Sequence, residues 1–310
     1  MRKSSLLLCF ALFLPTVASA QYTGPAAGQK VAFLGDSITA FGWGKPAGYV
    51  QLVSHALELE GKKIEVIPAG VGGNTSKDML ARVDKDVIAK KPDWMTLSCG
   101  VNDVWHGDKG VVLDEYQKNI TEIVTKAQAA GIKVVILTAT MITEDQSAAN
   151  NQRLIPYNEF LRSLAKEKGL PLVDLNAAMQ AALAQEKAKL PDFKGNFLTL
   201  DGVHMTPVGD QMMATAILKT WGVTDDQIAQ ATQAWGDLDC TVQLVLNPSL
   251  KVSQYLQLRS LAASQGTTID ALVSDAVKKD LETLLSAAPP ATVPTTPAAT
   301  PSTNAPPAKP

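Results

Sequence analysis

The stretch VAFLGDSIT, residues 31–39, decides the fold class of this chain of 310 residues. It begins with a short apolar run and then changes abruptly to the polar tripeptide Gly35–Asp36–Ser37. An apolar run of this length that ends at a glycine is typical of a buried strand leading into a loop. The loop does not have the GxGxxG pattern that cradles a pyrophosphate, so we do not expect a dinucleotide site here.

Further apolar runs follow the first, and amphipathic stretches separate them. The later runs begin near Ile64, Trp94, Val134 and Pro171. The intervening helices are expected near residues 49–60, 77–90, 113–130, 156–168 and 177–190. Near-continuous apolar strands joined by helices are typical of a parallel sheet that is covered on both faces. The sequence therefore predicts an α/β fold with a doubly wound, five-stranded parallel sheet and helices on both faces.

Polar segments follow each of the first three runs. They contain Ser37 in GDSIT, Gly73 in PAGVGGNTS and Asn102 in SCGVND. Because open parallel sheets bind their ligands at the carboxyl ends of the strands, we expect these segments to meet at one edge of the sheet. The Gly73 amide and the Asn102 side chain could donate to an oxyanion, where each donor is worth roughly 2.7–4 kcal/mol.

Far downstream, the run LDGVHMTP places Asp201 three residues before His204. A serine hydroxyl becomes a good nucleophile when an imidazole takes its proton, and a carboxylate holds that imidazole in the required tautomer. Thr206 and Pro207 then have the pattern of a helix cap and first-turn proline. Each segment alone could be a turn, a surface pair or a cap. Their joint order after successive strands favours the active site of a serine hydrolase.

These four blocks, in this order, resemble the SGNH hydrolases, also called GDSL esterases and lipases. The resemblance covers about residues 28–225, and the first block reads GDSI where the family name has GDSL. It implies a flavodoxin-like SGNH fold. It also implies Ser37 as nucleophile and as oxyanion donor through its own amide, with Gly73 and Asn102 as the other donors. By the same resemblance His204 is the base and Asp201 its orienting partner.

Three side chains near these blocks are candidates for contacting substrate. Trp43 follows the nucleophile, and Trp105 and His106 follow Asn102. A tryptophan beside a hydrolase nucleophile can stack on a sugar ring, but each of these side chains could equally serve in packing. We interpret Asp36 and Asp103, which flank the proposed catalytic residues, as structural supports.

The composition does not suggest a metal, a cofactor or a charged macromolecular partner. The sequence has no HExxH or CxxC motif and no histidine pair at i, i+4 spacing, so we expect neither a metal site nor a cofactor. The formal net charge of -2 favours a neutral small-molecule or polysaccharide ester over nucleic acid. Beyond the first 20 residues the cysteines are Cys99 and Cys240, which are too few for a disulfide-stapled fold, and Cys99 is expected to be a small buried residue.

The first residues have the pattern of a signal peptide, which we assign to residues 1–20. Arg2 and Lys3 precede the apolar run 6–14, and residues 18–20 form an A-x-A cleavage site. The apolar run is far shorter than the roughly 20 residues that a membrane-spanning helix needs. We therefore expect a secreted or periplasmic protein with no membrane span.

Residues 226–286 predict a small, mostly helical C-terminal module, and residues 287–310 a disordered tail rich in alanine, proline and threonine. A strand at 241–246 and two helices split at Gly266 faintly resemble ribbon-helix-helix proteins, which dimerise and bind DNA. The strand TVQLVL has no basic residue, so we expect a packing or homodimerising module and not a DNA-binding one.

Taken together, the sequence predicts a secreted serine ester hydrolase that acts through an acyl-enzyme on short acyl esters. We favour a carbohydrate acetylesterase, because Trp43 and Trp105 flank the site and no long apolar lid is visible. A lysophospholipase or an acyl thioesterase of the same family is the alternative. A catalytically idle carbohydrate-binding relative is the alternative from another class, although Ser37 and His204 are both present.

Overall fold

A computed structural model describes residues 22–193, 195–238 and 251–288 of the chain. The predicted signal peptide, the predicted strand 241–246 and nearly all of the predicted tail lie outside these residues.

Five parallel strands form a single sheet in the order β2-β1-β3-β4-β5. The strands are β1 (Lys30–Gly35), β2 (Glu65–Gly70), β3 (Trp94–Ser98), β4 (Lys133–Leu137) and β5 (Leu172–Val173). Leu34 in β1 pairs with Ala69 on one side and with Leu97 on the other. The chain thus leaves β1 first toward one edge of the sheet and then toward the other, which creates the switch point where such folds bind ligands.

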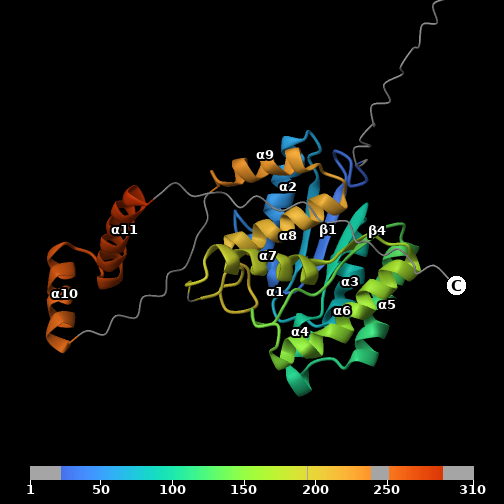
Figure 1. The fold of residues 1–310 in the computed structure, drawn as a ribbon, viewed down its shortest axis with the longest axis horizontal. Coiled ribbons are helices and arrows are strands. Elements are labelled where there is room, and N and C mark those ends of the chain that lie inside the picture. Colours follow the sequence, from blue (N-terminus) through green and yellow to red (C-terminus); the bar gives the residue numbers. More distant parts are fainter. Residues whose placement is uncertain (1–21, 194, 239–250, 289–310) are drawn as a thin grey trace, which may run out of the picture. The chain divides into compact units, whose positions relative to one another are not determined.

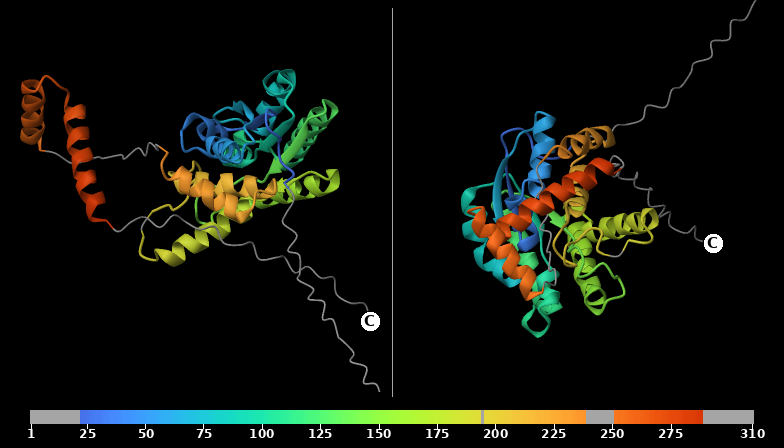
Figure 2. Two further views of the ribbon diagram at one scale, coloured as in Figure 1. Left: turned by 90° about the horizontal axis from the view of Figure 1, so that it is seen from above. Right: turned by 90° about the vertical axis from the view of Figure 1, so that its left-hand side faces the viewer.

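Helices cover both faces of this sheet, as Figures 1 and 2 show. On one face α2 (Tyr49–Leu59) packs against α8 (Pro207–Thr220), and α9 (Asp225–Trp235) contacts both. On the other face α5 (Leu113–Ala129) packs between α3 (Ser76–Asp86) and α6 (Ala149–Lys168). Because both faces are covered, the side chains of β1 and β3 are buried on both sides. The prediction of a doubly wound α/β fold is confirmed.

The remaining elements are short or peripheral to the sheet. They are α1 (Ser37–Gly44), α4 (Val101–Trp105), α7 (Leu175–Lys189) and the 3-10 turns η1 (Ile88–Lys90) and η2 (Gly107–Lys109). The first two were not predicted, because α1 and α4 are too short to show helical periodicity in a sequence.

The prediction for α6 was wrong at its start. The helix begins at Ala149, seven residues before the predicted start, and Pro156 lies inside it. Proline favours the first turn of a helix, which explains the prediction, but here the buried side chains of Asn151, Leu154 and Tyr157 hold the first turns against the protein. Packing of a buried face thus outweighs the single backbone hydrogen bond that the proline cannot donate.

The compact unit around the sheet is longer than the predicted segment 28–225. At its beginning the amide of Thr23 donates to the carbonyl of Trp221 at 2.8 Å. At its end α9 buries Ile228 and Trp235 against the unit. Among the described helices, none is long and apolar enough to cross a membrane.

A second unit contains α10 (Val252–Ser264) and α11 (Ile269–Ala287), which form a helical hairpin drawn in orange and red in Figure 2. The hydroxyl of Thr268 caps α11 by accepting from the amide of Ala271 at 3.2 Å. Between residues 251 and 288, Ala262 is the one buried residue, while Val252, Leu284 and Leu285 are exposed. The hairpin therefore has almost no core of its own.

Candidate active site

Ser37 lies where β1 ends and α1 begins, and it is the first residue of that helix. The carboxyl group of Asp36 caps the helix by accepting from the amide of Ile38 at 2.9 Å. A side chain at Gly35 would overlap the side chain of Thr39, so only glycine allows a turn this tight. The sequence GDS thus folds into a strand-to-helix turn that presents the Ser37 hydroxyl at the switch point of the sheet.

Asp201 and His204 lie on the turn of a small hairpin that precedes α8. Thr199 and Met205 form its antiparallel bridge, and the amide of Leu200 donates to the carbonyl of His204 at 2.7 Å. Within the turn, Oδ1 of Asp201 accepts from the amides of Val203 at 3.0 Å and His204 at 2.8 Å. These bonds fix the backbone so that the two side chains face each other.

The structure brings Ser37, His204 and Asp201 into a hydrogen-bonded line. His204 Nε2 is 2.9 Å from Ser37 Oγ, and His204 Nδ1 is 2.7 Å from Asp201 Oδ2. Because a carboxylate only accepts, the network assigns the proton to Nδ1 and leaves Nε2 free to accept from the serine. This arrangement can take a proton from a nucleophilic hydroxyl.

The carboxyl group of Asp201 is held in its ionised form. Partial burial raises its pKa, but hydrogen bonds from the ring and amide of His204 and from the amide of Val203 outweigh that effect. The pKa of Asp201 therefore lies below its ordinary value. A carboxylate that stays ionised can orient the imidazole and stabilise its charged form.

The three predicted oxyanion donors lie in the segments that follow β1, β2 and β3. The Ser37 amide is in the first turn of α1, where a helix offers no acceptor. Gly73 has a φ of +75°, a conformation that favours glycine, and a Cβ at its neighbour Gly72 would lie 3.9 Å from Ser37 Cβ. Asn102 is buried, and its Nδ2 donates one hydrogen to the carbonyl of Asn74 at 3.0 Å. The amide group of Asn102 thus keeps a second hydrogen for an oxyanion.

Two buried carboxyl groups, those of Asp36 and Asp103, form hydrogen bonds within and between these segments. The carboxyl group of Asp103 accepts from the amide of Ser76 at 2.9 Å and from Cys99 Sγ at 3.5 Å. Burial raises the pKa of Asp103, and burial also raises the pKa of Asp36 to about 6. Asp36 caps α1, and Asp103 holds the start of α3, so both act as structural supports in the way that the sequence predicts. Cys99 is a buried free thiol whose pKa is raised by burial.

Aromatic side chains at the site differ in part from those singled out in the sequence. Trp43 is half-buried against the core, whereas Trp105 and His106 are exposed at the end of α4. The ring packed against His204 is Phe41, with ring centroids 5.0 Å apart. Phe41 is not among the residues predicted to contact substrate, although its spacing of four residues from Ser37 would place both on one side of any helix.

Each catalytic block also carries one large, exposed apolar side chain. These are Phe41, Val71, Trp105 and Leu200, which are between 41% and 50% exposed. Phe41 lies one helical turn after Ser37, and Trp105 one turn after Asn102. Leu200 directly precedes Asp201, and Val71 precedes Gly72 and Gly73. Phe41 packs against His204, so this exposed apolar side chain lies directly beside the reacting groups.

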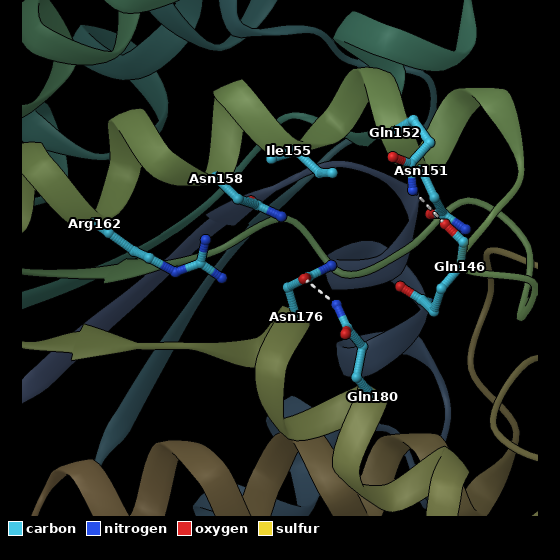
Figure 3. Close-up of a pocket in the computed structure, with 8 residues that line it drawn as sticks. All are labelled: Gln146, Asn151, Gln152, Ile155, Asn158, Arg162, Asn176 and Gln180. Atoms are coloured by element: carbon cyan, nitrogen blue, oxygen red, sulfur yellow. Dashed lines mark hydrogen bonds between the residues drawn. The ribbon is translucent and has the colours of Figure 1, made fainter. Parts of the chain in front are cut away.

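A separate pocket of about 140 Å³ lies between α6 and α7 and contains none of these residues (Figure 3). Its lining residues are Gln146, Asn151, Gln152, Ile155, Asn158, Arg162, Asn176 and Gln180. Arg162 is paired with Asp174 at 2.7 Å, so the lining is polar without an unpaired charge. Within the described residues, no three histidine, cysteine, aspartate or glutamate side chains are grouped as a metal site would require.

Comparisons with known proteins give the same assignment as the geometry. The model of the GDSL-like Lipase/Acylhydrolase family matches residues 33–212. The chain is 30% identical over 214 residues to an acetylxylan esterase from Geobacillus stearothermophilus, which covers 63% of this chain and 94% of the relative. It is also 34% identical over 138 residues to the esterase TesA of Pseudomonas aeruginosa. That alignment covers 44% of this chain and 64% of the esterase.

Solved structures are similar as well. The acetyl xylan esterase AlAXEase has 32% sequence identity and a TM-score of 0.57, covering 61% of this chain and 98% of that chain. The resemblance to SGNH hydrolases is therefore confirmed, and the family match spans more than half of the 310 residues. The chain belongs to the GDSL-like lipase and acylhydrolase family and is a carboxylic ester hydrolase.

Proposed function

We propose that the protein removes short acyl groups, acetyl above all, from carbohydrate esters through an acyl-enzyme formed on Ser37. The observation that carries this proposal is the line of hydrogen bonds from Ser37 through His204 to Asp201, with distances of 2.9 and 2.7 Å. Three structures of the related esterase Axe2 are described as catalytic mutants in which a serine, an aspartate or a histidine is replaced by alanine. In Axe2 the aspartate and histidine are three positions apart, as Asp201 and His204 are here.

The first half of the reaction transfers the acyl group to the enzyme. His204 Nε2 takes the proton of Ser37 Oγ while that oxygen attacks the ester carbonyl carbon. The carbonyl oxygen becomes an oxyanion, which accepts hydrogen bonds from the amides of Ser37 and Gly73 and from Asn102 Nδ2. When the tetrahedral intermediate collapses, His204 gives its proton to the leaving alcohol, and Ser37 carries the acyl group.

The second half releases the acid. Water enters as the nucleophile, and His204 Nε2 takes one of its protons while the oxygen attacks the acyl carbon. The second tetrahedral intermediate expels Ser37 Oγ, which regains its proton from His204. The products are the free alcohol and the carboxylic acid, and the enzyme needs no cofactor at any step.

Two exposed aromatic side chains and the similar proteins support the carbohydrate preference. Phe41 and Trp105 are exposed aromatic side chains that can stack on the apolar face of a sugar ring. Two of the similar proteins are described as acetylxylan esterases. Trp43 and His106 remain proposed substrate contacts.

The test is a comparison of nitrophenyl acetate, butyrate and palmitate as substrates, together with acetylated xylan, for the wild type and Ser37→Ala. We expect acetate to be the fastest nitrophenyl ester, with acetate released from xylan and no turnover by the variant. Preference for palmitate with no release from xylan would contradict the carbohydrate assignment and favour a lysophospholipase or thioesterase. No ester hydrolysis by the wild type would favour a carbohydrate-binding role.

We also propose that the protein is exported after removal of residues 1–20. The support is the basic start, the apolar run 6–14 and the small residues 18–20. Expression with the native N-terminus, followed by N-terminal sequencing of the extracellular or periplasmic protein, tests the proposal. A mature chain that still begins at Met1 would contradict it.

A further inference from the structure

The hairpin that carries Asp201 and His204 is held at its base by a buried carboxyl group. Glu144 follows β4 in the loop that leads to α6, and it is only 7% exposed. Its Oε1 accepts from the amides of Leu198 at 2.7 Å and Thr199 at 2.8 Å and from the Thr199 hydroxyl at 2.9 Å. Its Oε2 accepts from the amide of Phe197 at 2.8 Å. One side chain thus binds three successive amides of the catalytic hairpin.

The neighbouring residue holds the tip of the same hairpin. The amide of Thr143 donates to the carbonyl of Gly202 at 2.8 Å, between Asp201 and His204. Thr143 has a φ of +69°, which is rare for a β-branched residue and costs free energy. Gly202 has a φ of +97°, and a Cβ there would lie 3.1 Å from Thr143 Cα. Glycine therefore allows both the turn and the close approach.

The loop that contains Thr143 and Glu144 is itself fixed. Asn151, in the first turns of α6, accepts at Oδ1 from the amide of Ile142 at 2.8 Å. Its Nδ2 donates to the carbonyls of Thr143 at 3.0 Å and Asp145 at 2.7 Å. Asn151 also lines the pocket between α6 and α7, where it is drawn in Figure 3. The loop is therefore bonded to a long helix on one side and to the catalytic hairpin on the other.

We propose that Thr143 and Glu144 form a clamp that positions the Asp201–His204 pair, with Glu144 as a positioning residue for the reaction. The proposal rests on the proposed function, because it assigns a purpose to the geometry of that site. His204 reaches Ser37 from a hairpin that lies between α7 and α8 and belongs to none of the five strands of the main sheet. The clamp contacts both the base of the hairpin and its turn, so it fixes position and rotation together.

A positioning role differs from a general contribution to stability, because it affects the reaction rate of the folded protein. A misplacement of about 1 Å in a reacting group can cost about 100-fold in rate even when the protein remains folded. Glu144→Gln keeps the size of the side chain but replaces one acceptor oxygen with a donor NH2, so at least the bond from Phe197 or those from Leu198 and Thr199 are lost. The clamp would then loosen without a cavity being formed.

The test compares Glu144→Gln and Gly202→Ala with Glu159→Gln, a matched control on the exposed side of α6. For each folded variant, kcat and KM for nitrophenyl acetate are measured per active site by burst titration, as is the pH dependence of kcat/KM. The downfield proton resonance of the bond from His204 Nδ1 to Asp201 is recorded by NMR, because this readout does not require turnover.

We expect kcat to fall about 10- to 100-fold in Glu144→Gln and Gly202→Ala, with KM within about twofold. The acid limb of the profile should move to lower pH, because a loosened Asp201 stabilises the charged imidazole less. The NMR resonance should weaken or shift in both variants and remain unchanged in Glu159→Gln. Wild-type kcat per titrated site and an unchanged resonance in Glu144→Gln, with only a lower melting temperature, would overturn the proposal. If the wild type hydrolyses no ester, the proposed function fails while the resonance still tests the clamp.

Discussion

The guanidinium group of Arg82, on α3, donates from Nη2 to the carbonyl of Gly35 at the end of β1, at 2.9 Å. The same group donates from Nε to Oδ1 of Asn74 at 2.6 Å and from Nη1 to Asp86 at 3.1 Å. One planar cation therefore connects the strand end that carries Ser37 with the turn that carries Gly73. This link therefore helps to set the relative position of the proposed nucleophile Ser37 and the proposed oxyanion donor Gly73.

Replacing Arg82 by lysine should lower activity although the charge is kept. A lysine ammonium cannot reproduce the three donors in one plane, so at least one of the acceptors loses its partner. We expect a loss of about 1–3 kcal/mol in the free energy of unfolding, because the acceptors are partly buried, and a kcat about 10-fold lower. Urea unfolding and ester hydrolysis measure the two effects. Lys85→Ala, on an exposed position of the same helix, should change neither.

Asn102→Ala should reduce kcat about 100- to 1000-fold, because it removes a donor that is used chiefly in the transition state. KM should change little, since the oxyanion does not exist in the bound ester. The variant also loses the bond from Asn102 to the carbonyl of Asn74, so its melting temperature is recorded beside its kinetics. Equal losses in kcat and in folded fraction would point to a structural role only.

Activity should rise with pH along a single acid limb. Partial burial raises the pKa of Asp201, but hydrogen bonds from His204 and Val203 outweigh that effect and hold the pKa below its ordinary value, so Asp201 is ionised at neutral pH. The charged imidazole cannot accept the proton of Ser37, and the rate should increase as it becomes neutral. A profile of kcat/KM with nitrophenyl acetate checks this. A flat response from pH 5 to 8 would contradict the assigned base.

Asp210→Asn should stabilise the protein at alkaline pH. Burial raises the pKa of Asp210 to about 7, although the amide of Tyr49, which donates at 2.9 Å, and Lys45 lower it. A carboxyl group whose pKa is higher in the folded state adds stability below its unfolded pKa of 3.8 and loses that stability as pH rises through about 7. Asparagine keeps the acceptor for Tyr49 without the charge. We expect melting temperatures that match near pH 4 and a higher value for the variant at pH 8.

We expect the hairpin of α10 and α11 to find a partner in a second copy of the chain. Its leucine and valine side chains are exposed, and a unit this small rarely buries enough apolar surface to be stable alone. Multi-angle light scattering of the full chain and of a truncation after Asp237 tests the expectation. A dimer should become a monomer on truncation, and kcat per chain should be retained. The same number of chains per particle in both proteins would contradict dimerisation through the hairpin.

Much of the fold followed from local patterns in the sequence. The apolar runs and their amphipathic connections determined the five strands, because burial on both faces requires continuous apolar residues. Thr206 and Pro207 marked the start of α8, since capping chemistry depends only on neighbouring residues. The start of α6 did not follow from the sequence, because proline begins many helices but Pro156 lies inside this one, where tertiary contacts hold the first turns.

The sequence by itself determined which residues to propose for the site: Ser37, His204 and Asp201 were proposed because a motif, its order and its position after strands are all visible in one chain, and the structure joins the three by hydrogen bonds. Only the tertiary structure revealed Glu144 and Arg82. Each acts through backbone groups at least 47 residues away, and a backbone amide or carbonyl carries no signature in the sequence. The chemistry of a site depends on which side chains it contains, and these can be read from the sequence. The contacts that hold those side chains in place depend on which distant backbone segments the fold brings together.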